Sequence, residues 1–242
     1  MPSIDAIERR VVACTRCPEL RAYGAEVART KRRAYRGETY WGRPVPAFGD
    51  PRARVLVVGL APGAHGSHRT GRMFTGDASG EWLYRALYRA GFANRPDAIA
   101  RDDGLVLCDL LITAAARCAP PHNRPTPREL ANCRPYLLAE IAALAKLRVV
   151  IGLGAIGSEA ARRALEADGR RGAERVPFAH GAEMWFESPG SPRTAPIVLL
   201  MSYHPSRQNT NTGKLTEAML DAIFARARAL LAEPESERAR TL

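Results

Sequence analysis

Four short apolar runs alternate with four longer amphipathic segments along the chain. The apolar runs, each short enough for one buried β-strand, cover residues 54–60, 105–112, 148–153 and 197–201. The segments that follow them have apolar residues at helical spacing and cover residues 80–90, 127–146, 157–167 and 215–231. Because strand and helix alternate four times, the pattern predicts an α/β fold, a three-layer α/β/α sandwich around a central four-stranded, mainly parallel sheet.

The chain is long enough to bury one sizeable core. It has 242 residues, of which 46% are hydrophobic, and this suits one domain of the α/β class. We expect the domain to span residues 1–231 and the charged tail, residues 232–242, to be frayed. Residues 176–188, "VPFAHGAEMWFES", predict an additional small hairpin with His180 and Gly181 at its turn.

The net charge points to a polyanionic partner. Lys and Arg number 36 against 25 Asp and Glu, a formal net charge of +11, and such an excess attracts nucleic acid. The alternative is that an arginine- and alanine-rich chain with few lysines reflects genomic composition. No apolar run reaches the roughly 18 residues of a membrane span, and the N-terminus lacks the apolar segment of a signal peptide. We therefore expect a cytoplasmic protein with no membrane association, and a monomer.

The five cysteines form two pairs and one isolated residue. Cys14 and Cys17 lie in "CTRC", and Cys118 and Cys133 enclose "APPHNRPTPRELAN". Four thiolates are enough to hold one structural zinc or an iron–sulfur cluster, which would tie distant parts of the chain together. The alternative is four unlinked thiols, because a reducing compartment disfavours disulfides. Cys108 lies inside an apolar run and is expected to be buried.

The loops that follow the strands are where a ligand is expected, because open parallel sheets bind ligands beyond the carboxyl ends of their strands. One of these loops, "GLGAIG" at residues 152–157, matches a dinucleotide-binding fingerprint. It follows the third strand rather than the first, and Asp168 and Glu174 are poorly placed for a ribose-binding acid. We interpret it as a tight strand-to-helix turn without a cofactor. A nucleotide-dependent oxidoreductase is the alternative.

The first and fourth loops carry the candidate chemistry. Glycines and Pro62 let the first loop approach a ligand closely, and Phe74 is expected to be exposed there as a stacking platform for a base. The alternative for Phe74 is an aromatic that anchors the loop to the core. Asp77 is either a catalytic carboxylate or the N-cap of the next helix. In the fourth loop, His204 stands at the end of a buried strand and is held by Pro205.

Together these features resemble one family. "GLAPGAHGSHRTGRMFTGD" at residues 59–77, "HPSRQNTNTGKLT" at residues 204–216 and the four-cysteine framework are similar to family 5 (type b) of the uracil-DNA glycosylase superfamily. The resemblance implies an α/β/α domain that removes uracil and some other altered bases from double-stranded DNA and leaves an abasic site. It also implies a 4Fe–4S cluster, with Cys14, Cys17, Cys118 and Cys133 as its ligands.

The sequence departs from related families at two places. Related glycosylases carry an acid or an Asn in the first loop. At that place this chain has Gly63, Ala64 and His65, which we expect to bind the base. They also place a uracil-reading Asn four residues before the third cysteine, where this chain has Ala114. Asn123 is the nearest remaining amide that could pair with a base edge. Both departures resemble the type b pattern and predict weak selectivity for uracil.

The chemistry of the reaction that the resemblance implies suggests roles for the loop residues. His204 would donate a hydrogen bond to the departing base, Asp77 would stabilise the sugar cation or orient a water, and Phe74 would stack on the extruded base. The residues expected to contact DNA, part of them inserted where the base was, are Ser206, Arg207, Gln208, Asn209 and Lys214. The basic run at residues 29–36 either contacts the DNA backbone or is a solvated helix face. The alternative function is a non-catalytic iron–sulfur or zinc protein that binds DNA by charge.

Overall fold

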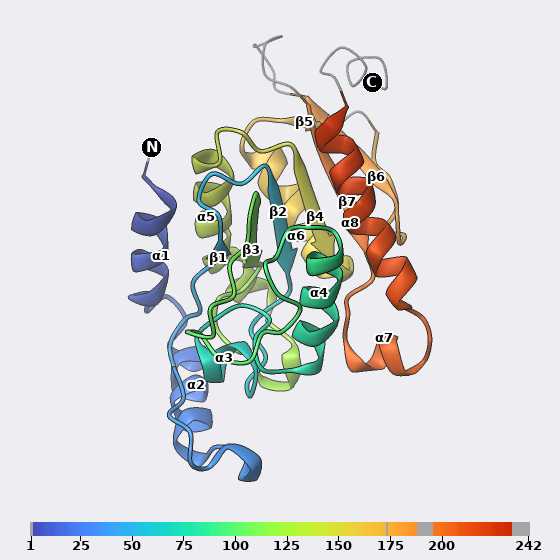
Figure 1. Ribbon diagram of the computed structural model, residues 1–242. Coiled ribbons are helices and arrows are strands. Elements are labelled where there is room, and N and C mark those ends of the chain that lie inside the picture. The colour runs from blue at the N-terminus through green and yellow to red at the C-terminus, as the bar shows by residue number, and fades with distance from the viewer. Residues whose placement is uncertain (1, 173, 188–195, 234–242) are drawn as a thin grey trace.

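The computed structural model describes residues 2–172, 174–187 and 196–233. Within these residues the strands form one seven-stranded sheet, in the order β1-β3-β2-β4-β7-β6-β5 (Figure 1). The strands are β1 (Phe48–Gly49), β2 (Val55–Gly59), β3 (Leu110–Ala114), β4 (Val149–Leu153), β5 (Arg171–Gly172), β6 (Glu183–Glu187) and β7 (Ile197–Ser202).

The four central strands, β3, β2, β4 and β7, are parallel, and all of their residues are buried. They correspond to the four predicted strands, so the prediction of an α/β fold with a mainly parallel central sheet is confirmed. Burial on both faces explains why each strand appears in the sequence as a continuous apolar run. The antiparallel strands β1 on one side and β6 and β5 on the other extend the sheet, and the apolar pattern did not predict them as parts of it.

Helices cover both faces of this sheet. They are α1 (Ile4–Val12), α2 (Pro18–Thr30), α3 (Ser67–Thr70), α4 (Ala78–Arg89), α5 (Pro127–Ala143), α6 (Gly154–Ala167), α7 (Arg207–Asn211) and α8 (Glu217–Ala232), with 3₁₀ turns η1 (Arg33–Tyr35) and η2 (Pro121–Asn123). The four predicted helices correspond to α4, α5, α6 and α8. No helix within the described part of the chain has the length and apolar character needed to cross a membrane.

Strand β2 shows how the two layers share the sheet. Val55 and Val57 pack into a core with α4 and α8, whereas Leu56 and Val58 pack into a second core with α1, α5 and α6 (Figure 1). Successive side chains of a strand point to opposite faces, so one apolar strand supplies both cores. The result is the predicted three-layer arrangement.

One strand begins later than the sequence predicted, and the expectation for Cys108 is wrong. Strand β3 starts at Leu110, because Asp109 adopts a left-handed backbone conformation (φ 61°) and receives hydrogen bonds from the Arg54 backbone and side chain. Before it, Leu105 and Leu107 are buried, whereas Val106 and Cys108 are exposed. An alternating edge segment therefore precedes the buried strand, and Cys108 lies on its solvent side.

The prediction of a small hairpin at residues 176–188 is wrong, because only its second arm, β6, forms a strand. Strand β6 pairs with β5, at Arg171–Gly172, and residues 176–180 form no strand. Gly181 lies in a turn with a φ of 80°, as the sequence indicated. Ser188 and residues 234–242 of the charged tail lie outside the described residues.

The "GLGAIG" segment has a packing role in this fold. It joins β4 to α6, and Gly157 faces the β2 carbonyl oxygen of Val58, where a Cβ would lie 2.6 Å away. The Ser158 hydroxyl donates to the Gly152 carbonyl (3.1 Å) and closes the turn. These contacts account for the glycines through helix–strand packing alone.

Candidate active site

The candidate site is built by two loops that the parallel sheet brings together. The loop of residues 60–77 follows β2, and His204 follows β7, two strands away in the sheet. The rings of Phe74 and His204 meet with their centroids 5.8 Å apart and their planes tilted by 31°. The first and fourth loops are separated by more than a hundred residues in sequence, and the shared edge of the sheet brings them into contact.

Asp77 is the N-cap of α4, as the alternative for this residue proposed. Its Oδ1 accepts a hydrogen bond from the Gly80 backbone N–H (3.0 Å). Its Oδ2 packs against the glycine loop, 3.1 Å from the position a Cβ would take at Gly63 and still closer at Gly66. Any side chain at Gly66 would therefore displace the carboxylate. The cap uses one carboxylate oxygen and directs the other toward this loop.

Burial raises the pKa of Asp77 above its ordinary value. Backbone hydrogen bonds from Gly80 and Ser79 and the positive charge of Arg207 oppose this effect without cancelling it. Arg207 was predicted only as a DNA contact, and its charge also acts on Asp77. A carboxylate held in a partly desolvated site, where ionisation is costly, is typical of a functional group.

His204 is held by its backbone. Its carbonyl accepts hydrogen bonds from the Asn209 side-chain amide (2.8 Å) and the Ser206 backbone N–H (2.8 Å). Its Cβ lies 3.3 Å from the position a Cβ would take at Gly154. Burial lowers the pKa of His204 to about 4, so the imidazole is neutral at physiological pH. A neutral imidazole with a fixed backbone can donate a hydrogen bond without carrying charge.

Phe74 is buried, so the expectation of an exposed aromatic is wrong. Its exposed fraction is 8%, and its side chain joins the core cluster under α4. Its backbone is in the left-handed region (φ 52°), and its N–H donates to the buried Ser67 hydroxyl (2.8 Å). A bulky residue adopts this conformation only when its surroundings fix it. Packing into the core holds the ring in place, and contact with His204 brings it to the site.

His65 and the neighbouring loop are fixed by two residues that sequence reasoning missed. The Tyr40 hydroxyl lies 3.0 Å from His65 Nδ1, and burial lowers the pKa of His65. Arg69 donates to the carbonyls of His65 (2.8 Å) and Gly76 (3.0 Å) and forms an ion pair with Glu38. Arg69 therefore braces two points of the loop that leads to Asp77. The sequence shows Arg69 inside the glycine-rich motif, but its partner Glu38 lies 31 residues away and no local pattern connects the two.

Three of the five predicted DNA-contacting residues, Arg207, Gln208 and Asn209, lie in helix α7. Ser206 is the N-cap of α7, and Arg207 and Gln208 are exposed on its first turn. The Asn209 amide is already engaged with the His204 carbonyl. Lys214 is exposed, with its Nζ 4.9 Å from the centroid of the Tyr203 ring.

Asn123 lies in a short 3₁₀ turn, outside the sheet and the α-helices. It is exposed at the end of η2, with a φ of 56°, and its backbone N–H donates to the Pro120 carbonyl (3.2 Å). Ala114 is buried at the end of β3 and pairs with Gly59 at the end of β2. The base-binding role proposed for Asn123 therefore depends on an exposed turn, whereas Ala114 is part of the rigid sheet.

The four paired cysteines gather between the N-terminal helices and α5. Cys17 and Cys118 share a small buried cluster with Leu20, and the Asn132 amide lies 3.4 Å from the Cys17 sulfur. Burial raises the pKa of Cys118 to about 12, and the nearby thiols of Cys133, Cys14 and Cys17 add to the effect. Among the described residues, no three His, Cys, Asp or Glu side chains are arranged to hold one metal ion. All five thiols are free.

A comparison with known families decides the assignment. The sequence model of the Uracil DNA glycosylase superfamily matches residues 46–228, which include both loops of the candidate site. The chain belongs to the uracil DNA glycosylase superfamily. The predicted family is thereby confirmed, and the chain is placed among DNA N-glycosylases, which are hydrolases.

Individual relatives agree with this placement of the glycosylase. It is 48% identical to the type-5 uracil-DNA glycosylase of Thermus thermophilus over 93% of this chain and 97% of the relative. It is 44% identical to the type-5 enzyme of Pyrobaculum aerophilum, over 93% and 92%. Similarity to the type-4 enzyme of the same organism is lower, at 34% identity over 69% of this chain and 74% of the relative.

Proposed function

We propose that the protein hydrolyses the N-glycosidic bond of uracil and other altered bases in double-stranded DNA and leaves an abasic site. The observation that carries this proposal is the meeting of Phe74 and His204 at the end of the sheet, beside the loop that holds Asp77. A base inside a duplex is unreachable, so the nucleotide must be extruded into this site.

On the base side, His204 acts as a hydrogen-bond donor. Breaking the glycosidic bond leaves negative charge on the departing base, which a preorganised donor stabilises in the transition state. The low pKa of His204 keeps its imidazole neutral, so it donates an N–H without losing a proton to the base. One such donor contributes about 3 kcal/mol to transition-state stabilisation.

On the sugar side, Asp77 acts through its charge. The sugar becomes cationic as the bond breaks, and a carboxylate about 4 Å away contributes up to about 4 kcal/mol before its desolvation is subtracted. Its Oδ2 faces the glycine loop, where backbone can approach the substrate or a water. The raised pKa of Asp77 reflects the cost of holding this charge in place before the substrate arrives.

The remaining loop residues bind the extruded nucleotide and the DNA. We assign the base pocket to Phe74, Asn123 and the backbone of residues 63–65, with Phe74 stacking on the base. Helix α7 presents Arg207 and Gln208 to the duplex, and Lys214 follows it. Ser206 caps α7, and Asn209 orients the His204 backbone, so these two residues act partly through positioning.

We assign a 4Fe–4S cluster to Cys14, Cys17, Cys118 and Cys133. The thiols of Cys14, Cys17 and Cys133 lie close enough to Cys118 to raise its pKa. Four thiolates suit a 4Fe–4S cluster, in which each binds a different iron, and the family resemblance favours the cluster over a single zinc ion. When bound, the cluster would tie the N-terminal helices to α5, and we assign it no part in bond cleavage.

The cluster assignment predicts iron and a loss of stability in a cysteine variant. Anaerobically purified protein is expected to be brown, with visible absorption that fades in acid, and to contain about four irons per chain. Cys17→Ala is expected to lower the melting temperature by roughly 5 °C or more. Cys108→Ala is the matched control, since Cys108 is exposed and outside the cysteine group. A colourless protein with equimolar zinc would contradict the assignment.

Duplexes that each carry one altered base test the function and its breadth. We expect alkali-sensitive abasic sites from uracil and from at least one other base, such as hypoxanthine. Because residue 114 is Ala, no side-chain amide at this position can hydrogen-bond the base, and the site should discriminate weakly between uracil and other bases. A wild-type protein that leaves uracil duplexes intact would overturn the proposed function.

Ala114→Asn is expected to narrow the preference toward uracil, measured as the ratio of single-turnover rates for uracil and hypoxanthine. The added amide would supply a check at the end of β3, where the residue is already buried. Ala114→Val is the control, because it adds bulk at the same position without hydrogen-bonding atoms. Equal narrowing by both variants would show that space, rather than an amide, sets selectivity.

The free thiols bear on the compartment in which the protein works. We propose that the protein works as a monomer in a reducing cytoplasm, where an oxygen-sensitive cluster and unpaired cysteines are stable.

A further inference from the structure

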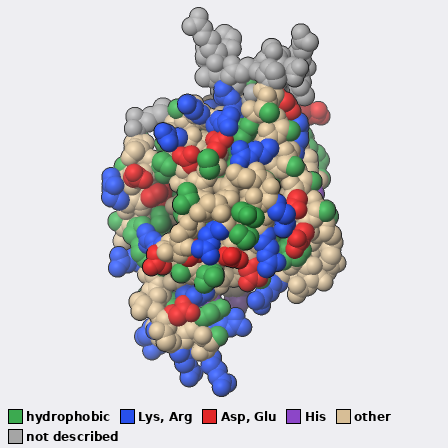
Figure 2. Space-filling view, in the orientation of Figure 1, with side chains coloured by type: hydrophobic (Ala, Val, Ile, Leu, Met, Phe, Trp, Pro, Cys, Tyr) green, Lys and Arg blue, Asp and Glu red, His purple; other side chains and the backbone are tan. Residues whose placement is uncertain are grey.

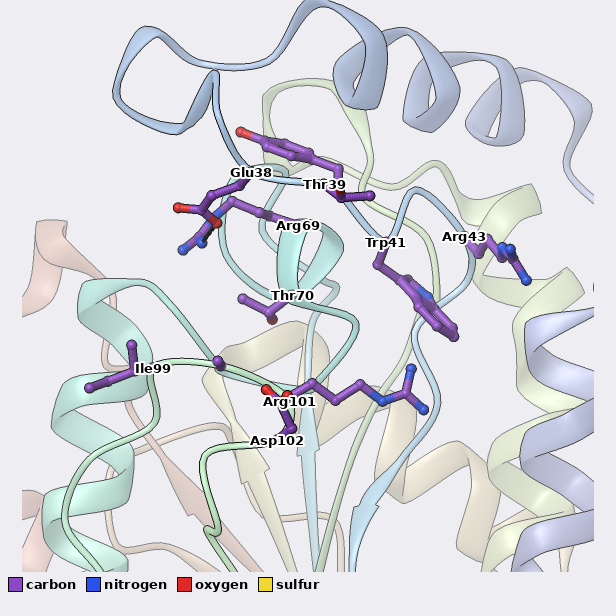
Figure 3. Close-up of a pocket in the computed structure, with 11 residues that line it drawn as sticks. Glu38, Thr39, Trp41, Arg43, Arg69, Thr70, Ile99, Arg101 and Asp102 are labelled. Carbon is purple, nitrogen blue, oxygen red and sulfur yellow. Dashed lines mark hydrogen bonds and ion pairs between the residues drawn. The ribbon is translucent and has the colours of Figure 1, made fainter.

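A cavity of about 550 Å³ lies next to the catalytic loop and contains none of Asp77, Phe74 or His204 (Figure 3). Its walls come from the segment after η1, from α3 and from residues 99–102. Two of its lining residues connect it to the loop of residues 60–77, since Arg69 belongs to that loop and Tyr40 hydrogen-bonds His65 within it. The cavity and the candidate active site therefore adjoin the same loop.

Two arginine guanidinium groups lie over the ring of Trp41, which lines this cavity. The Arg101 guanidinium lies 4.4 Å from the indole centroid and that of Arg43 lies 5.4 Å from it. Figure 3 shows Arg101 reaching across the cavity toward Trp41. The indole itself is fixed, since its Nε1 donates to the Pro44 carbonyl (3.1 Å) and its backbone N–H donates to the Arg69 carbonyl (2.8 Å). Two cations are thus held on a rigid aromatic that is bonded to α3.

These two arginines differ from the other arginines near the loop. Arg69 forms an ion pair with Glu38, and the two lie side by side in Figure 3. Within the described residues, Arg43 and Arg101 form no ion pair, and both are exposed. Their guanidinium N–H groups are therefore available to an incoming anion, although Asp102 also lines the cavity.

The surroundings extend this positive surface. Arg32, Arg33 and Arg36 are exposed just before the segment that lines the cavity. Figure 2 shows Lys and Arg side chains gathered at the lower end of the molecule, where Figure 1 places the end of α2 and the chain that follows it. A planar guanidinium pairs well with phosphate oxygens, and stacking on an aromatic ring preorganises it for that contact.

We propose that Trp41, Arg43 and Arg101 form a binding site for backbone phosphates of the substrate DNA strand, outside the base pocket. The two arginines contact phosphate, and Trp41 is a positioning residue that holds their guanidinium groups. The site adjoins the catalytic loop, so a strand bound here is held next to the extruded nucleotide. This inference rests on the proposed DNA substrate.

The double variant R43A/R101A tests the site by separating binding from chemistry. Single-turnover uracil excision is measured against enzyme concentration and salt. The half-saturating enzyme concentration is expected to rise about tenfold at physiological salt, with the maximal rate unchanged. Each lost phosphate contact lowers the slope of log affinity against log salt by about 1, so the double variant loses about 2.

The matched control is R9A/R52A, which removes two exposed arginines, one on α1 and one in the turn before β2, away from the carboxyl ends of the strands. It should keep the wild-type affinity and salt slope. Trp41→Phe should retain most of the affinity because it keeps an aromatic ring, whereas Trp41→Leu should lose part of it with no change in maximal rate.

Three outcomes would overturn the site. One is an unchanged salt slope in R43A/R101A, and another is a fall in maximal rate with unchanged half-saturation. In the third, the wild-type protein binds a free deoxynucleoside monophosphate, and R43A/R101A loses this binding but keeps the wild-type salt slope for DNA. The site would then bind free nucleotides rather than the DNA backbone. Uracil excision by the wild-type protein reports the proposed function separately, so failure of the site leaves that function standing.

Discussion

Asp77→Asn is expected to lower the single-turnover rate of uracil excision about a hundredfold while DNA affinity stays close to that of the wild type. Asn removes the charge that faces the developing sugar cation but keeps an oxygen that can cap α4, because Asn and Asp are equally good N-caps. The melting temperature should therefore not fall. The measurement is excision under saturating enzyme, together with a thermal denaturation curve.

The pH dependence of the same variant gives an independent check. Burial raises the pKa of Asp77, so the folded state favours its protonated form. The stability contributed by this protonation is present at low pH and is lost as pH rises through the raised pKa. The wild-type rate should fall as pH drops through that pKa, and the residual rate of Asp77→Asn should lack this decrease.

A control variant separates capping from catalysis. Thr216 caps α8 by accepting a hydrogen bond from the Met219 N–H (3.2 Å). Thr216→Ala should cost about 1 kcal/mol of stability without changing the excision rate. If Asp77→Asn excises uracil at nearly the wild-type rate, capping is the whole role of Asp77 and the proposed mechanism is wrong.

His204→Ala is expected to slow excision of uracil and hypoxanthine alike, by about a hundredfold or more. The imidazole is assigned to donate to the departing base, and any leaving base with a carbonyl within reach should lose this stabilisation. The measurement is the single-turnover rate on duplexes that carry either base. Unaltered rates, or a loss restricted to one base, would contradict the assignment.

His204→Gln and the pH profile refine this test. Gln keeps an N–H donor on a side chain without a titrating group, so it should recover part of the rate. Because the folded pKa of His204 is about 4, its neutral form persists across the physiological range. Stability from this group is present above the ordinary value of 6.5 and is lost as pH falls toward 4. His204→Ala should be less sensitive to acid unfolding over that interval.

The sequence by itself determined the layers and the motifs. Continuous apolar runs can form buried parallel strands only when helices cover both faces, so the three-layer α/β/α order followed from the pattern. Local residue chemistry also identified His204 with Pro205, and Asp77 at the start of a helix. The order and spacing of these motifs with the cysteines identified the superfamily, which the comparison confirmed.

The tertiary structure decided which residues meet and what each side chain contacts. Phe74 is buried against the core, because a loop with a left-handed residue can turn an aromatic inward where no periodic pattern marks it. Cys108 is exposed, because buried and exposed residues alternate before β3 and Cys108 falls on the solvent side. Glu38 braces the catalytic loop through Arg69, although the two residues are far apart in sequence. Such contacts depend on the order of the strands in the sheet and on how the loops pack at its edge. Local sequence patterns do not show which distant residues will meet in this way.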